Sequence, residues 1–139
     1  RVAISEMGSD VTRRDEVDYL LRRSEEFVET ARYQIDNGFL GLAVFSLEQA
    51  LQLCLKSKIL ACGIEYPRTH SVRALLEMLS DLSVEEKKSA IRSLLDKYLL
   101  ELGVLEDAYV TARYVMREFR KEEANRLLKV VEEVMKNVS

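Results

Sequence analysis

The sequence predicts an all-α protein, folded as an antiparallel helical bundle of about five helices. Apolar residues recur at three- and four-residue steps over most of the 139 residues, which is typical of helices that bury one face. Turn formers are scarce, with five Gly and one Pro, so the elements should be few and long. A chain of this length is expected to form one domain with a buried core.

The first helix is expected from about Val11 to Asn37, because Asn37 and Gly38 can take the left-handed conformation that ends helices. Residues 1–10 are then a tail or a trimmed end, and 11–138 form the single domain. The positions that make up the inner face of this helix are Val17, Leu20, Leu21, Ser24, Val28, Ala31 and Ile35.

The second helix, from Phe39 to Cys62, is different because it leaves only a narrow polar strip. A helix that is apolar on most sides is normally packed by neighbours on several faces, so we expect this one at the centre of the bundle. Gly63 is expected to end it.

Capping signals mark the next two helices. Thr69 or Ser71 can cap a third helix, and the sequence from Ser83 to Glu86 matches a capping box that would start a fourth. Gly103 is expected to interrupt the fourth. The apolar positions of the third helix are Val72, Leu75, Leu76 and Leu79. Those of the fourth are Ile91, Leu94, Leu95, Tyr98, Leu99 and Leu102.

The C-terminal part is less regular. The stretch from Val104 to Phe119 is expected to be helical but irregular, and the last helix is expected from about Glu122 to Asn137. Its inner residues are Leu127, Leu128, Val131, Val134 and Met135.

Composition argues against several classes of protein. The 24 acidic residues slightly exceed the 21 basic ones, which argues against broad coating of nucleic acid or of an anionic membrane. No apolar run approaches the roughly 20 residues that span a bilayer, and no secretory signal is visible. Cys54 and Cys62 are too far apart on one helix for a disulfide, and with His70 they cannot complete a zinc site. We expect a cytoplasmic protein without metal or cofactor.

Several short stretches, taken in order, form a recognisable pattern. Residues 43–56 read AVFSLEQALQLCLK, and residues 67–71 read PRTHS. Further on, residues 109–114 read YVTARY, and EEA opens the last helix at 122–124. In this order and on these elements, the chain resembles the HEPN family (higher eukaryote and prokaryote nucleotide-binding domains) from about Val17 to Val138.

This resemblance implies a helical bundle that dimerises and that often pairs with a minimal nucleotidyltransferase encoded beside it. Some relatives are RNA-cleaving toxins, in which an Arg precedes a His at a short helical spacing, so that one holds the phosphate and the other moves a proton. Here the single histidine is His70, and Arg68 precedes it by two residues, which on a helix would point to a different side. No histidine follows Arg113.

The first candidate site for a phosphate or a nucleotide consists of Arg68, His70 and Arg73. They surround the predicted start of the third helix, where free backbone N–H groups and the positive end of the helix dipole favour anions. A capped turn with local hydrogen bonds explains the same residues.

A second candidate is a stripe of residues at successive four-residue steps, which a helix would place on one side to stack a base and hold phosphates. Tyr114 lies beside it, within the stretch that resembles the family. The alternative is a solvated face with Glu106 and Glu118 as ion-pair partners. The residues of the stripe are Tyr109, Arg113, Arg117 and Lys121.

Lys56 is a third candidate, although a lysine near a helix C-terminus also suits the dipole and can extend its stem along an apolar face. No Gly-rich phosphate loop, nucleophile elbow or placed carboxylate pair accompanies these residues. The sequence therefore names no catalytic residue.

We expect a non-catalytic HEPN-like module that forms a homodimer, engages a minimal nucleotidyltransferase partner and binds nucleotide or RNA. The alternatives are a metal-independent ribonuclease toxin of a toxin–antitoxin pair and a purely structural assembly subunit. The dimer is expected because the chain offers more apolar surface than its own helices readily cover. The residues that suggest this surplus are Leu40, Leu42, Val44, Leu105, Tyr109 and Val110.

Overall fold

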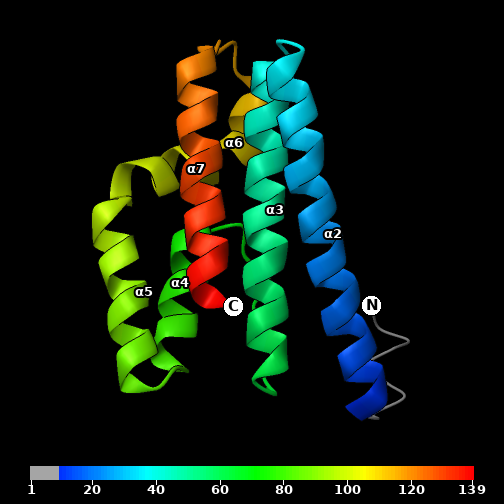
Figure 1. Cartoon of the computed structure of the whole chain (residues 1–139), viewed down its shortest axis with the longest axis vertical. Helices are drawn as coiled ribbons and strands as arrows, with labels where there is room; N and C mark the ends of the chain where they lie inside the picture. The colour runs from blue at the N-terminus through cyan, green and yellow to red at the C-terminus, as the bar shows by residue number, and fades with distance from the viewer. Residues whose placement is uncertain (1–9) are drawn as a thin grey trace.

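The computed structural model describes residues 10–139, except for the side chains of 10, 11, 112 and 113, and this range contains six helices and no strand (Figure 1). The predicted all-α bundle is confirmed. The predicted tail lies outside the described residues, apart from residue 10, which begins the first helix. The helices are α2 (Asp10–Asp36), α3 (Leu40–Ala61), α4 (Val72–Asp81), α5 (Glu85–Lys97), α6 (Leu99–Tyr114) and α7 (Lys121–Val138).

Helix α3 lies at the centre of the bundle, as predicted, in contact with α2, α4, α6 and α7 (Figure 1). It supplies many of the buried residues, and Leu47, Leu51 and Leu55 among them are fully buried. The α2–α3 turn uses Gly38 at φ 79°, which an L side chain rarely adopts. Within the described residues, no helix combines the length and the apolar character needed to cross a bilayer.

The predicted cap of α4 is confirmed for one of the two candidate residues. The Ser71 hydroxyl accepts a hydrogen bond from the backbone N–H of Ala74 at 3.1 Å. The predicted capping box at Ser83 is wrong, because the Ser83 hydroxyl donates to the carbonyl of Leu79 at 2.7 Å. It thus satisfies the end of α4, and Val84 stands at the start of α5 without a side-chain cap.

The predicted interruption at Gly103 is also wrong, because the helix breaks earlier, at Tyr98. The backbone N–H of Tyr98 closes α5 on Leu94, and its carbonyl opens α6 by accepting from Leu102. The Tyr98 hydroxyl donates to Glu133 of α7, a contact that local sequence signals do not report. The turn also moves a predicted inner residue, Leu99, to the surface.

Helix α6 ends at Tyr114, so the irregular helix predicted through Phe119 is shorter than expected. Residues 115–120 have no helical structure, yet Phe119 is buried and anchors them to the core. The guanidinium of Arg117 lies 4.2 Å from the centre of the Phe119 ring, a cation–π contact that covers the ring from outside.

The surplus apolar surface differs in detail from the prediction. Val44 and Leu105 are fully buried inside the chain, whereas Leu42 and Val110 are exposed. On α6, the structure adds Leu99, Leu100 and Tyr114 to the predicted Val110 as exposed apolar residues. The large exposed hydrophobic residues of α6 are Leu99, Leu100, Val110 and Tyr114.

The burial of α3 predicts a strong dependence of stability on its core leucines. Leu51→Ala should lower the free energy of unfolding by about 2–5 kcal/mol, because it leaves a cavity on the most enclosed helix. Urea denaturation followed by circular dichroism measures this change. Val84→Ala, at an exposed position, is the control and should change stability by less than about 0.5 kcal/mol. Equal effects of the two substitutions would contradict a central α3.

Candidate functional site

Two of the predicted regions meet in space. The imidazole of His70, in the connector before α4, stacks on the ring of Tyr109 in α6 with 3.9 Å between ring centroids and 18° between planes. Phe45 of α3 lies on Tyr109 as a third, tilted ring at 6.4 Å. His70 remains exposed, whereas Tyr109 is partly buried. The three rings therefore form a row that runs from the partly buried Phe45 and Tyr109 to the exposed His70, which we call the ring stack.

A carboxylate that the sequence analysis treated as a solvated partner lies beside this stack. Glu106 accepts hydrogen bonds from the Ser71 hydroxyl at 2.8 Å, from the backbone N–H of Arg73 at 3.4 Å, and from the Arg73 guanidinium at 3.2 and 3.1 Å. Partial burial by itself would raise the pKa of Glu106, but the hydrogen bonds from Arg73 and Ser71 outweigh it and lower the pKa. Glu106 is therefore held as a carboxylate.

Glu106 occupies the anion-binding groups at the start of α4. The anion favoured by the helix N-terminus is supplied from within the chain, by Glu106, and the Arg73 guanidinium is engaged in a two-point ion pair with it. Arg68 lies two residues before His70 in the same connector and is exposed.

The predicted stripe from residue 109 to residue 121 does not form. Because α6 ends at Tyr114, Arg117 lies in the non-helical connector, where it pairs with Glu123, and Lys121 begins α7. Arg113 falls within α6, and its side chain is outside the described set. Tyr114 is exposed at the end of α6.

A buried polar network on α3 escaped the sequence analysis. Glu48 is fully buried and accepts hydrogen bonds from the amides of Gln49 at 2.7 Å and Gln52 at 2.6 Å. Burial raises the pKa of Glu48, and the two amides offset this only in part. Lys56, a predicted site residue, donates to Gln52 at 2.9 Å and lies 5.3 Å from the Tyr66 ring centre. Partial burial lowers the pKa of Lys56.

The signal for this network was present in the sequence. Glu48, Gln52 and Lys56 are four residues apart, so they share one side of the otherwise apolar α3. A polar row on a helix that is expected to be buried indicates a network within the core rather than a solvated strip.

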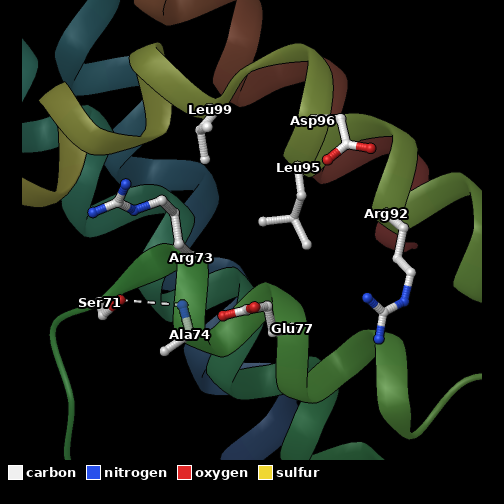
Figure 2. Close-up of a pocket in the computed structure, with 8 residues that line it drawn as sticks. All are labelled: Ser71, Arg73, Ala74, Glu77, Arg92, Leu95, Asp96 and Leu99. Atoms are coloured by element: carbon white, nitrogen blue, oxygen red, sulfur yellow. Dashed lines mark hydrogen bonds between the residues drawn. The ribbon is translucent and has the colours of Figure 1, made fainter.

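A cleft of about 470 Å³ lies between α4 and the bend from α5 to α6 (Figure 2). Figure 2 shows Leu95 and Leu99 pointing into it, with Arg73 and Arg92 at opposite edges. Both arginines are already paired, Arg73 with Glu106 and Arg92 with Asp81 at 3.1 Å. The cleft thus has an apolar floor and walls of mixed charge, and its lining also includes Ser71, Ala74, Glu77 and Asp96.

The geometry of the ring stack suits the binding of a planar ring. An exposed imidazole backed by aromatic rings offers a surface on which a nucleobase can stack. Among the described residues, no group of three or more His, Cys, Asp or Glu side chains is arranged to hold a metal ion.

The two perturbed carboxylates predict opposite pH dependences. Because the pKa of Glu106 is lowered in the folded protein, its ionisation stabilises the fold above the ordinary value of about 4.3, and this contribution is lost as the pH falls through the lowered pKa. The pKa of Glu48 is raised, so its ionisation destabilises the fold as the pH rises above the ordinary value.

Glu106→Gln should therefore be less stable than the wild type near about pH 7, and the difference should shrink toward about pH 3. Glu48→Gln should be close to the wild type near about pH 4 and more stable than it near about pH 7. Urea unfolding at a series of pH values measures both. Parallel pH profiles for the three proteins would show that neither carboxylate is perturbed as described.

Comparison with known proteins supplies the family. The profile of the HEPN domain matches residues 17–139, nearly the whole chain. A search of curated proteins gave no match. Among solved structures, TT1696 from Thermus thermophilus is similar in fold, with a TM-score of 0.71 and 24% identity over 88% of this chain and 94% of that chain. The resemblance found in the sequence is thus confirmed, and the chain belongs to the HEPN domain family.

Proposed function

We propose that this chain is a non-catalytic HEPN module that binds the base of a nucleotide or of an RNA segment on the ring stack. The observation that carries the proposal is the parallel contact of His70 with Tyr109, which leaves the imidazole exposed. Stacking of a base on such a ring contributes about 1–3 kcal/mol. Arg68, exposed in the same connector, supplies a positive charge for the attached phosphates.

Binding of ATP and of a short single-stranded RNA, measured by calorimetry and by fluorescence anisotropy, tests this proposal. His70→Ala should weaken binding by about 5- to 150-fold, because it removes the outer ring of the stack. Tyr33→Ala, which removes an exposed aromatic ring from α2, is the matched control and should leave binding unchanged.

Two results would contradict the proposal. Equal affinities of the wild type and His70→Ala would show that the base does not bind on the ring stack. Specific RNA cleavage that disappears in His70→Ala would instead support the ribonuclease alternative, with His70 as general acid or base.

We propose further that the module is a homodimer that engages a minimal nucleotidyltransferase. The support for the dimer is the outer face of α6, where Leu99, Leu100, Val110 and Tyr114 are exposed. Exposed apolar side chains that gather on one face of a helix are normally covered by a partner, and a second copy of the same chain can cover them symmetrically. The nucleotidyltransferase rests on the family alone, and co-purification with the product of a neighbouring gene tests it.

Light scattering at low micromolar concentration should give a mass near twice the 16.0 kDa of the chain. Val110→Glu should reduce the mass to that of one chain, since it buries a charge at the proposed interface. Val84→Glu, at an exposed position just before α5, is the control and should leave the mass unchanged. A wild-type mass of one chain would exclude the homodimer.

A further inference from the structure

We propose that Glu106 is a positioning residue that holds His70 against Tyr109, so that the ring stack is set before any ligand arrives. The inference deepens the proposed function and rests on it for the identity of the ligand. The contacts that support it are all made within the chain and involve no ligand.

Glu106 connects the two segments that carry the stacked rings. On α6 it lies one helical turn before Tyr109, and across the gap it accepts from Ser71, the residue directly after His70. The stack itself joins residues from two segments that are far apart in sequence, and aromatic pairs of this kind contribute only about 0.5–1.5 kcal/mol. A charge-assisted hydrogen bond one residue away restrains where the imidazole can lie.

The connector is fixed on both sides of His70. The backbone N–H of Ser71 donates to the Thr69 hydroxyl at 3.0 Å, and the backbone N–H of Thr69 donates to the carbonyl of Pro67 at 3.0 Å. Ser71 also caps α4 through Ala74 while its own hydroxyl donates to Glu106. Residues 67–71 are thus restrained by hydrogen bonds among Pro67, Thr69 and Ser71, and the imidazole of His70 is exposed to solvent.

Arg73 completes the arrangement and is, on this argument, a positioning residue rather than a ligand contact. Its guanidinium spans both oxygens of Glu106 and lies over Gly103, where a Cβ would come within 3.5 Å of the Arg73 Nη1 atom. The Glu106 side chain is only 20% exposed, so this pair is shielded more than a typical surface pair. Arg68 is then the arginine of the connector that is left for the ligand.

The single histidine makes the test direct. Its ring C–H signals in the proton NMR spectrum are unambiguous, and the Tyr109 ring should displace them upfield. Tyr109→Leu provides the unstacked reference. Glu106→Ala should move the His70 signals toward this reference, whereas Glu106→Gln, which keeps an acceptor for Ser71 and Arg73, should give a smaller displacement.

Glu101→Gln is the matched control, because it weakens an ion pair on the same helix, with Arg126 of α7 at 2.6 Å. It should leave the His70 signals in place. Circular dichroism and urea unfolding establish that each variant is folded. If Glu106→Ala does not fold, Arg73→Gln removes the guanidinium while leaving the carboxylate, and it should also displace the signals toward the reference.

Unchanged His70 signals in a folded Glu106→Ala protein, or in Arg73→Gln, would overturn the inference. The ligand readout is separate: ATP affinity should fall in Glu106→Ala and be largely restored in Glu106→Gln. Absence of ATP and RNA binding in the wild type would contradict the proposed function, whereas the NMR spectra of the free protein would still decide whether Glu106 positions the ring.

Discussion

Burial of α3 is the constraint on which the rest of the structure depends, because a helix that is apolar on most sides has to be covered from several directions. Helices α2, α4, α6 and α7 all contact it, and α5 reaches the core through its own packing on α4 and α7. The hydrophobic effect that drives this covering is non-directional, so it does not choose the register of the surrounding helices. Specific polar contacts therefore set the register of the helices around α3.

The polar row of α3 and the contacts of Glu106 supply that specificity. The buried carboxyl group of Glu48 accepts hydrogen bonds from the side-chain amides of Gln49 and Gln52, which restrains the rotamers of these residues on α3. On the facing helix, Glu106 fixes the height of α6 relative to the start of α4. Both carboxylates lie in the region where α3, α6 and the connector meet. The same region carries the ring stack.

The sequence alone predicted those features that depend on local signals. The bounds of α2 and α3 follow from apolar periodicity and from Gly38 and Gly63, and the Ser71 cap follows from a residue that can satisfy a helix start. The resemblance to the HEPN family also came from the order of short stretches, each of which lies on one element.

Features that depend on distant residues were not predictable in this way. The break at Tyr98 involves Glu133 of α7, and the state of Arg73 depends on Glu106, which is 33 residues away in sequence. The stripe of four residues from 109 to 121 failed for a related reason. Its periodicity is helical, but α6 ends at Tyr114 and the chain continues without helical structure to the buried Phe119.

The anchoring of the α6–α7 connector by a buried ring has a consequence for how the chain can be altered. The start of α7 is fixed by the buried ring of Phe119 and by the Glu123 carboxylate, which accepts from the backbone N–H of Arg120, whereas the side chain of Met116 is fully exposed. Extra residues in such a loop cost little closure entropy. The connector is therefore a natural point at which to insert a peptide tag, or at which related chains could differ in length without disturbing the helices on either side.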